Sequence, residues 1–260
     1  MPEWIAVICL GIIEGVTEFL PVSSTGHLLL AENWLPRQTD LFNTVVQCGA
    51  VLAVIVIFTD RLKQLAFKWR ETAARDYLLK LCAAFAITGA GGLTLKKLDF
   101  ELPETVAPVA AATLIGGILF LIVEKCLLKR TLSDTITWRM AIIVGLAQLL
   151  AAVFPGASRS GVTILAALML GSSRPAATEF SFLLGIPTLL SAGALQTISA
   201  LRHAAEQPID WSMIGLGSAV GAITAFGVVK WLLRFVQTHT FVGFAWYRIV
   251  LGLGLLLGVS

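Results

Sequence analysis

Charged residues are scarce in this chain. Asp, Glu, Lys and Arg make up 13% of its 260 residues, whereas hydrophobic residues make up 57%. Soluble domains carry about 25% charged residues, so this composition excludes a soluble domain and predicts an integral membrane protein in contact with the lipid bilayer. The net charge of +3 is small and the basic residues are scattered, which excludes nucleic acid as a partner.

Cysteine is sparse too, and its spacing excludes the common metal and disulfide frameworks. None of the four cysteines belongs to a CxxC or CxxH pattern and all fall in apolar segments, so we interpret them as small apolar side chains. The first apolar stretch lacks the basic residues that precede the core of a signal peptide. We therefore expect no cleavable signal peptide.

Long apolar runs are frequent in this chain. Six are long enough to cross a bilayer: 41–58, 77–95, 107–124, 179–199, 212–234 and 244–259. The remaining runs are short or interrupted by Pro and Gly, and we interpret them as two re-entrant helix pairs: 4–20 with 22–31, and 139–154 with 160–171. The predicted fold class is an all-α integral membrane protein with six transmembrane helices and two re-entrant helix pairs.

An internal repeat divides the chain at an offset of 134 residues. The apolar blocks of the first half fall on those of the second half, and Glu14 falls on Gln148. We therefore predict a single membrane domain, 1–260, built from two repeats of about 1–125 and 135–260. The identical pairs are Trp4 and Trp138, Ile8 and Ile142, Gly11 and Gly145, Pro21 and Pro155, and Ser24 and Ser158.

The Lys and Arg residues of the loops predict the topology. Loop 59–76 carries five of them and loop 125–139 carries four, so we expect both loops on the cytoplasmic side. Loops 96–106 and 200–211 have fewer basic residues or balance them with acids, so we expect them outside, together with both termini. An odd number of crossings in each half inverts the second repeat. The two re-entrant pairs should then enter from opposite sides and meet.

The stretch EGVTEFLPVSSTGH, from Glu14 to His27, places polar groups inside an apolar sequence. A charged side chain at bilayer depth costs about 2.5–3.5 kcal/mol, so such residues mark functional sites. Glu14 and Glu18 are four residues apart and share one face of a helix that Pro21 then ends. We predict a reaction site or ion site on a broken helix. The residues that supply its hydroxyls and imidazole are Ser23, Ser24, Thr25 and His27.

A second polar stretch, FPGASRSGVT, runs from Phe154 to Thr163. Pro155 and Gly156 predict a tight turn, and the helix that follows directs its positive end and backbone N–H groups toward the same point as the neighbouring hydroxyls. Arg159 adds a forked donor set suited to phosphate oxygens. The stretch therefore predicts an oxyanion cradle, with the two carboxylates of the first stretch opposite it to bind a divalent cation or take a proton.

Simpler interpretations exist for individual residues. The two acids could neutralise Arg159 in a buried ion pair, and His27 could be a core histidine bonded to a backbone carbonyl. The serines could act only as helix caps. Arg174 and Glu179 flank a loop beside a proline, and we interpret them as a surface pair.

At these residues the chain resembles the undecaprenyl-diphosphate phosphatase family of the bacitracin-resistance type, through EGVTEFLPVSSTGHL (Glu14–Leu28) and PGASRSGVT (Pro155–Thr163). The resemblance covers essentially the full length. It implies a multi-pass hydrolase of the bacterial inner membrane, with inverted repeats and an active site facing the periplasm. Such an enzyme removes the terminal phosphate of undecaprenyl diphosphate, which recycles the carrier lipid for peptidoglycan synthesis and confers bacitracin resistance.

The resemblance also implies a polyprenyl diphosphate as substrate and a divalent cation, Mg²⁺ or Ca²⁺, as cofactor; a homodimer is a further expectation. We expect Arg159 to clamp the diphosphate. We expect Glu14 and Glu18 to hold the cation, or one of them to orient a nucleophile. Ser24 is the expected nucleophile, with His27 as its base or as the acid for the leaving group. A phosphorylated His27 and direct attack by water are the rival routes. The expected phosphate-binding residues are Ser23, Thr25, Gly156, Ser158, Arg159, Ser160 and Thr163.

Two other protein classes compete with this prediction. Inverted repeats with broken helices are also typical of transporters, so a lipid-phosphate transporter or flippase is the main alternative. A simple anion carrier, however, does not need an adjacent serine, histidine and pair of acids. The lipid phosphatases that use two histidines are a second alternative, but the chain lacks their KxxxxxxRP element.

Overall fold

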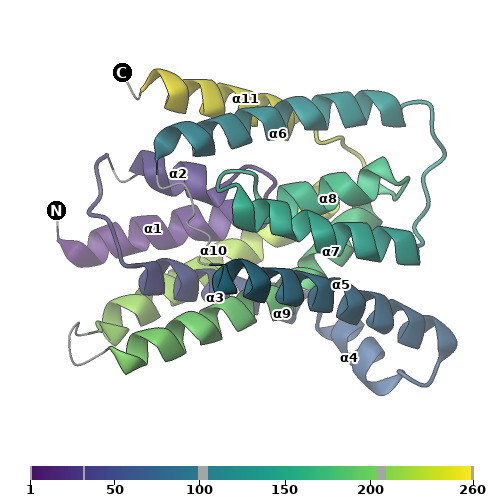
Figure 1. Cartoon of the computed structure of the whole chain (residues 1–260), viewed down its shortest axis with the longest axis horizontal. Helices are drawn as coiled ribbons and strands as arrows, with labels where there is room; N and C mark the ends of the chain where they lie inside the picture. The colour runs from purple at the N-terminus through teal and green to yellow at the C-terminus, as the bar shows by residue number, and fades with distance from the viewer. Residues whose placement is uncertain (1, 32, 99–104, 204–208, 259–260) are drawn as a thin grey trace.

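The computed structural model describes residues 2–31, 33–98, 105–203 and 209–258. Apart from one isolated bridge between Ser133 and Ser172, the regular elements in these ranges are α-helices, which confirms the all-α prediction. They run side by side along the long axis of the view in Figure 1. Their bounds are α1 Glu3–Thr17, α2 Ser24–Ala31, α3 Asp40–Ile57, α4 Thr59–Phe67, α5 Thr72–Lys97, α6 Val106–Leu127, α7 Trp138–Val153, α8 Arg159–Met169, α9 Arg174–Arg202, α10 Trp211–Phe235 and α11 Val242–Leu257.

Within the described ranges, five helices are long and apolar enough to cross a membrane: α3, α5, α6, α9 and α10. The sixth predicted crossing, 244–259, corresponds to α11, which has 16 residues. A helix of that length spans about 24 Å, less than the roughly 30 Å of a hydrocarbon core. The protein is therefore a multi-pass membrane protein with five full-length candidate spans.

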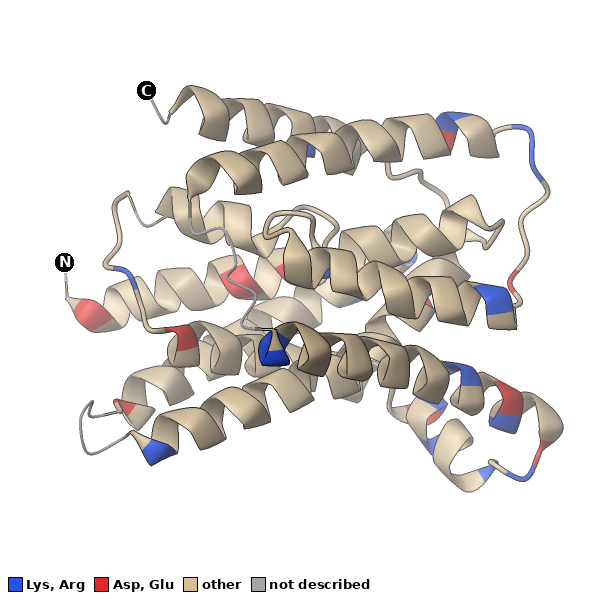
Figure 2. Ribbon diagram, viewed as in Figure 1, with Lys and Arg blue, Asp and Glu red and all other residues tan. Residues whose placement is uncertain are grey.

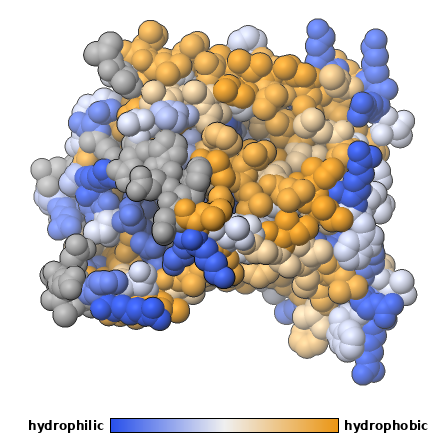
Figure 3. All heavy atoms as spheres, viewed as in Figure 1, coloured by the Kyte–Doolittle hydropathy of each residue, from blue (hydrophilic) through white to orange (hydrophobic). Residues whose placement is uncertain are grey.

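Charged residues gather at the two ends of the helices, as Figure 2 shows, and a hydrophobic belt lies between those ends in Figure 3. The two ends of the chain lie at the same end of the molecule, and the basic segments around α4 and between α6 and α7 lie at the opposite end. Which of these two ends faces the cytoplasm stays a prediction. The acids predicted to offset Lys96 and Lys97 lie outside the described residues.

Both polar stretches form a helix, a turn and a second, shorter helix. The first hairpin consists of α1, the turn 18–23 and α2, and the second consists of α7, the turn 154–158 and α8. Helix α1 ends at Thr17, before Pro21, so Glu18 occupies the C-terminal cap rather than the helix interior. Glu18 keeps helical backbone angles (φ −64°, ψ −41°), and its side chain therefore still lies one turn beyond Glu14.

Helix contacts pair up between the two halves. Helix α1 packs against α10, and α7, which follows α1 by the repeat offset, packs against α5. In the same way α2 contacts α11 and α8 contacts α6, while α3 contacts α9 and α6 contacts α11. Gly11 and Gly145 explain part of the repeat: an added Cβ would lie 2.8 Å from the Gly217 carbonyl oxygen and 2.7 Å from that of Ala84, respectively. These glycines are needed for close helix packing.

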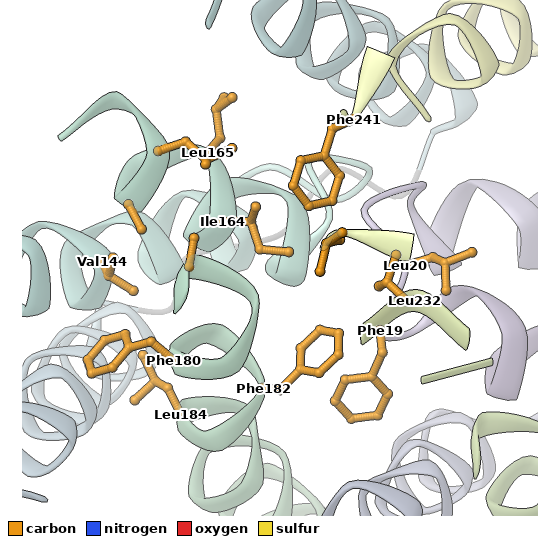
Figure 4. Close-up of a cluster of buried hydrophobic side chains, with 14 of the residues drawn as sticks. Phe19, Leu20, Val144, Ile164, Leu165, Phe180, Phe182, Leu184, Leu232 and Phe241 are labelled. Atoms are coloured by element: carbon orange, nitrogen blue, oxygen red, sulfur yellow. The ribbon is translucent and has the colours of Figure 1, made fainter. Parts of the chain in front are cut away.

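A hydrophobic cluster packs against the turn 18–23 and helix α8 (Figure 4). Phe19 and Leu20 of the first turn are buried in it, together with Ile164 of α8 and Phe182 of α9. The rings of Phe19 and Phe182 meet edge-on, with centroids 5.1 Å apart and an interplanar angle of 73°. The backbone between Glu18 and Pro21 is thereby fixed against the second half of the chain.

The interpretation of Arg174 and Glu179 as a surface pair is wrong. The guanidinium of Arg174 donates two hydrogen bonds to the buried carboxylate of Glu124 on α6, and that carboxylate also accepts the backbone N–H of Phe241. Glu179 instead accepts a hydrogen bond from Arg61 at 3.0 Å. Partners this distant in sequence carry no local pattern, so spacing alone could not reveal them.

Candidate active site

The first turn brings a carboxylate and a hydroxyl into contact. Glu18 is buried, with 7% of its surface exposed, and its Oε2 accepts a hydrogen bond of 3.1 Å from the Ser24 hydroxyl. Ser24 is the first residue of α2, so the turn 18–23 folds the end of α1 back onto the start of the next helix. This contact makes Glu18 a candidate proton acceptor for Ser24.

Glu14 lies one turn earlier on the same face and is more deeply buried. Neither of its carboxylate oxygens has a hydrogen-bond partner of normal geometry among the described residues, although the Gln47 side chain faces it. Burying an unpaired carboxylate is unfavourable unless a proton or a cation neutralises it. The oxygens of Glu14 are therefore a fitting place for a divalent cation.

The surroundings suit a cation that keeps ligands other than protein side chains. In the part of the chain that the structure describes, no cluster of three or more His, Cys, Asp or Glu residues forms a metal site. Glu14 and Glu18 would thus supply the protein carboxylates, and water or phosphate oxygens the remaining ligands. Mg²⁺ is commonly bound in this way, through one or two carboxylates.

The second turn has the same capping geometry as the first. Ser158 and Ser23 both have left-handed backbone angles (φ 67° and 75°), and each hydroxyl accepts a hydrogen bond of 3.2 Å from the backbone N–H three residues later. The structural counterpart of Ser158 is therefore Ser23 rather than Ser24, a correction of one residue to the repeat. Ser24 then corresponds to Arg159, the first residue of α8.

The two turns meet directly. Arg159 Nη2 lies 3.3 Å from Glu18 Oε1, across 141 residues of sequence. The Ser160 hydroxyl donates to the carbonyl of Leu20 at 3.0 Å, and the guanidinium of Arg159 lies 5.4 Å from the Phe19 ring centroid. The structure thus brings together the acid, hydroxyl and guanidinium that the sequence places in two separate stretches. It also contains the buried acid–arginine ion pair of the simpler interpretation.

Among the described hydrogen bonds, none joins His27 to Ser24. The Nδ1 of His27 lies 2.7 Å from the carbonyl oxygen of Ser23, and its Nε2 lies 2.6 Å from the hydroxyl of Tyr247 on α11. The hydrogen bond of Ser24 goes to Glu18 instead. The geometry therefore favours Glu18 over His27 as the group that takes the Ser24 proton.

The predicted phosphate-binding residues fall into two groups. Thr25 is exposed beside Ser24, and Ser158 is half-buried at the start of α8. Ser23, Ser160, Thr163 and Gly156 are buried, and their polar atoms bond to the protein. The Thr163 hydroxyl donates back to the carbonyl of Arg159 at 2.8 Å, for example, and the Gly156 carbonyl accepts from the Thr113 hydroxyl at 3.2 Å. The second group supports the turns.

Sequence reasoning missed Arg248. Its side chain is completely buried in α11, and its guanidinium donates to the carbonyls of Pro21 at 3.1 Å, Gly156 at 3.2 Å and Ala157 at 3.0 Å. It also donates to the carbonyl of Thr113 inside α6 at 3.2 Å. One cation thus ties both turns together. The sequence did contain a signal for this residue, because Arg248 is a charged residue inside the apolar run 244–259.

An apolar groove opens beside His27. Its volume is about 440 Å³, and its walls come from α1 and the first turn, α2, α10 and α11. Leu20, Trp231 and Phe244 line it, with His27 and Tyr247 as polar members. The groove has room for a hydrocarbon chain with its polar end near the first turn.

These features define a class of protein: a multi-pass helical membrane protein with a buried carboxylate, hydroxyl and guanidinium site between two broken helices. The chain belongs to the family described as "Bacitracin resistance protein BacA", whose pattern matches residues 7–254. It is 48% identical over 259 residues to the "Undecaprenyl-diphosphatase" of Rhizobium johnstonii, covering 99% of this chain and 97% of that relative. It is also 47% identical over 257 residues to the protein of that name from Xylella fastidiosa, covering 98% of each.

Proposed function

We propose that this chain is an undecaprenyl-diphosphate phosphatase. It hydrolyses undecaprenyl diphosphate to undecaprenyl phosphate and inorganic phosphate, and so recycles the lipid carrier for peptidoglycan synthesis and confers bacitracin resistance. Membership of the family and the names of its relatives support this activity. The structural observation that carries it is the contact of Arg159 with Glu18 at 3.3 Å, on the carboxylate that also accepts the Ser24 hydroxyl.

The contacts suggest a role for each group. Arg159 binds phosphate oxygens and stabilises charge on the phosphoryl group during transfer. Ser24 Oγ forms a bond to the terminal phosphorus while the bond from phosphorus to the bridging oxygen breaks, and Glu18 takes the Ser24 proton. Undecaprenyl phosphate leaves, and water then releases phosphate from the serine. Attack by His27 or directly by water are the rival routes.

A divalent cation, Mg²⁺ or Ca²⁺, would be held by Glu14 and Glu18. The unpartnered oxygens of Glu14 support this assignment. When bound, such an ion neutralises phosphate charge and polarises the phosphoryl oxygen.

The arrangement in the membrane forms part of the same proposal. The paired contacts of α1 with α10 and α7 with α5 support two inverted repeats, 1–125 and 135–260, each with a re-entrant hairpin. In this arrangement α11 completes a set of six crossing helices in the bacterial inner membrane. The basic segments face the cytoplasm, and the first hairpin and the active site open to the periplasm. A homodimer stays a prediction.

The decisive experiment is a phosphate-release assay with a short-chain prenyl diphosphate and protein purified in detergent, where no transport can occur. We expect release that depends on added Mg²⁺ or Ca²⁺ and stops on chelation with EDTA. The matched blank is Glu18→Gln, which keeps the size of the side chain but removes its charge. Equal release with this variant, or none from the wild type with either cation, would contradict the proposal. The transporter alternative is not favoured, because the relatives are named as diphosphatases.

A further inference from the structure

The two ring nitrogens of His27 have partners of different kinds. Nδ1 lies 2.7 Å from the carbonyl oxygen of Ser23, which can only accept a hydrogen bond. Nδ1 must therefore carry a proton. In the neutral ring Nε2 is then the unprotonated nitrogen, since a neutral imidazole has one donor and one acceptor.

The partner of Nε2 is the hydroxyl of Tyr247, at 2.6 Å. A phenol hydroxyl can donate to the neutral ring and can also accept from the protonated ring, so this contact persists in both states of His27. The two rings are stacked as well, with centroids 5.5 Å apart and planes 8° from parallel. Tyr247 thus fixes the orientation of the His27 ring and provides the hydrogen-bond partner of Nε2.

The position of this pair relates it to the reaction. His27 and Tyr247 both line the apolar groove beside the first turn. Tyr247 is 48% exposed, so its side chain is not part of the packed interior. Its neighbour in sequence is Arg248, whose guanidinium binds the carbonyls of both turns and thereby fixes the register of α11 against them.

We infer that Tyr247 is a positioning residue for the phosphatase reaction, acting through His27. The Ser23 carbonyl keeps His27 in the Nδ1–H tautomer, and Tyr247 holds the ring so that Nε2 faces the groove as the working nitrogen. This inference rests on the proposed function for its kinetic part, but the tautomer is a property of the folded protein alone. It assigns Nε2 to every role considered for His27: base, acid or nucleophile.

The test is Tyr247→Phe, which removes only the hydroxyl. We expect kcat for a short-chain prenyl diphosphate to fall about 10-fold, in the range found for partners that orient a catalytic group, with KM within about twofold of the wild type. Tyr77→Phe is the matched control, because Tyr77 is the other tyrosine of the chain and its hydroxyl contacts Glu179, far from His27 in the sequence and on other helices. It should leave kcat unchanged.

A ¹⁵N NMR spectrum of histidine-labelled protein supplies the second readout, with the His27 signals assigned through His27→Asn. The wild type should show a protonated Nδ1 and a hydrogen-bonded, unprotonated Nε2. In Tyr247→Phe the Nε2 signal should move to the value of a free acceptor while Nδ1 stays protonated. This spectrum decides the tautomer even if the protein released no phosphate.

Three results would overturn the inference. The first is a wild-type His27 protonated on Nε2. The second is a kcat of Tyr247→Phe within twofold of the wild type. The third is a raised KM with unchanged kcat, because that would place the phenol on the lipid rather than on the histidine.

Discussion

The two hairpins share a scaffold and differ in chemistry. In both, a serine with a left-handed backbone caps a short helix, and a glycine three residues later donates the capping hydrogen bond. After that serine the first hairpin has Ser24, and the second has Arg159. The repeated element is thus the serine-capped turn, and the two copies carry different side chains. Neither hairpin alone has both an acid and a guanidinium.

The preceding helices differ in the same way. Glu14 in α1 and Gln148 in α7 occupy equivalent positions and are both buried, and each has a buried oxygen without a hydrogen-bond partner among the described residues. The amide of Gln148 donates to the Thr88 hydroxyl at 2.9 Å, and this contact anchors α7 to α5. The glutamine has a local structural partner that Glu14 lacks. We therefore attribute the charge of Glu14 to the proposed reaction, whereas the contact with Thr88 is sufficient to explain Gln148.

The largest effect should come from the first hairpin. Ser24→Ala removes the proposed nucleophile, and we expect kcat to fall about 10⁴-fold, as losses of a nucleophile do. Ser23→Ala is the control, since the Ser23 hydroxyl only caps α2 and its loss costs about 1 kcal/mol of stability. Phosphate release and thermal unfolding measure the two effects. If Ser24→Ala retained a tenth of the wild-type rate, attack by Ser24 would be wrong and trapping a phosphorylated His27 would be the next test.

The counterpart in the second hairpin is Arg159→Ala. Removing one preorganised charged donor costs about 10²–10³-fold in kcat, and we expect the upper end because the guanidinium also pairs with Glu18. Arg159→Lys should recover only part of the rate, since an ammonium cannot make the same forked contacts. Steady-state phosphate release compares the three proteins. Near-normal turnover of the alanine variant would remove the second hairpin from the active site.

Placing the acid of the first half at the equivalent position of the second half should lower the stability of the protein without creating activity. Gln148→Glu introduces a buried carboxylate and removes the amide donor to Thr88, so we expect about 3 kcal/mol of lost stability, the cost of a charge at membrane depth. Gln148→Leu separates the lost hydrogen bond from the added charge. Thermal unfolding in detergent reads out both. An unchanged midpoint for Gln148→Glu would mean that the second half tolerates an acid as the first half does.

The smallest effect should come from the shared cap. Ser158→Gly relieves the left-handed backbone strain, which costs about 1–2 kcal/mol for a residue with a Cβ, and glycine is only a few tenths of a kcal/mol worse as a cap. We expect the unfolding midpoint to rise by about 2 °C. Ser158→Ala keeps the strain and loses the cap, so its midpoint should fall. The opposite order would show that the Ser158 hydroxyl does more than cap α8.

Local patterns in the sequence predicted the fold class and the main contacts of the candidate site. The repeat, the two broken helices and the meeting of Glu18 with Arg159 follow from residue spacing and from the cost of charge in an apolar chain. The predicted pairing of Ser24 with His27 is not among the described hydrogen bonds. Residues three apart at the start of a helix share a face but need not bond to each other. Ser24 bonds instead to Glu18 at the C-terminal cap of α1, and His27 bonds to Tyr247 on α11, whose position residue spacing cannot predict.

The role of Arg248 and the bounds of α11 could not be predicted from the sequence for the same reason. Arg248 was overlooked because an arginine near the end of an apolar run resembles an interfacial anchor, and its role depends on carbonyls from three distant segments. The predicted crossing 244–259 is displaced by two residues from α11, which has the same length of 16 residues and runs from Val242 to Leu257, because hydropathy does not show where a helix begins. Tertiary contacts decide both points.

The bonds of Arg248 also constrain how the protein is made. Helix α11 follows every other described helix in the chain, so a ribosome delivers this arginine after both turns have been synthesised. Until it arrives, the carbonyls of Pro21, Gly156 and Ala157 lack their shared donor. The link between the two turns is therefore completed late in biosynthesis, and a nascent chain interrupted before α11 lacks the arginine that joins them.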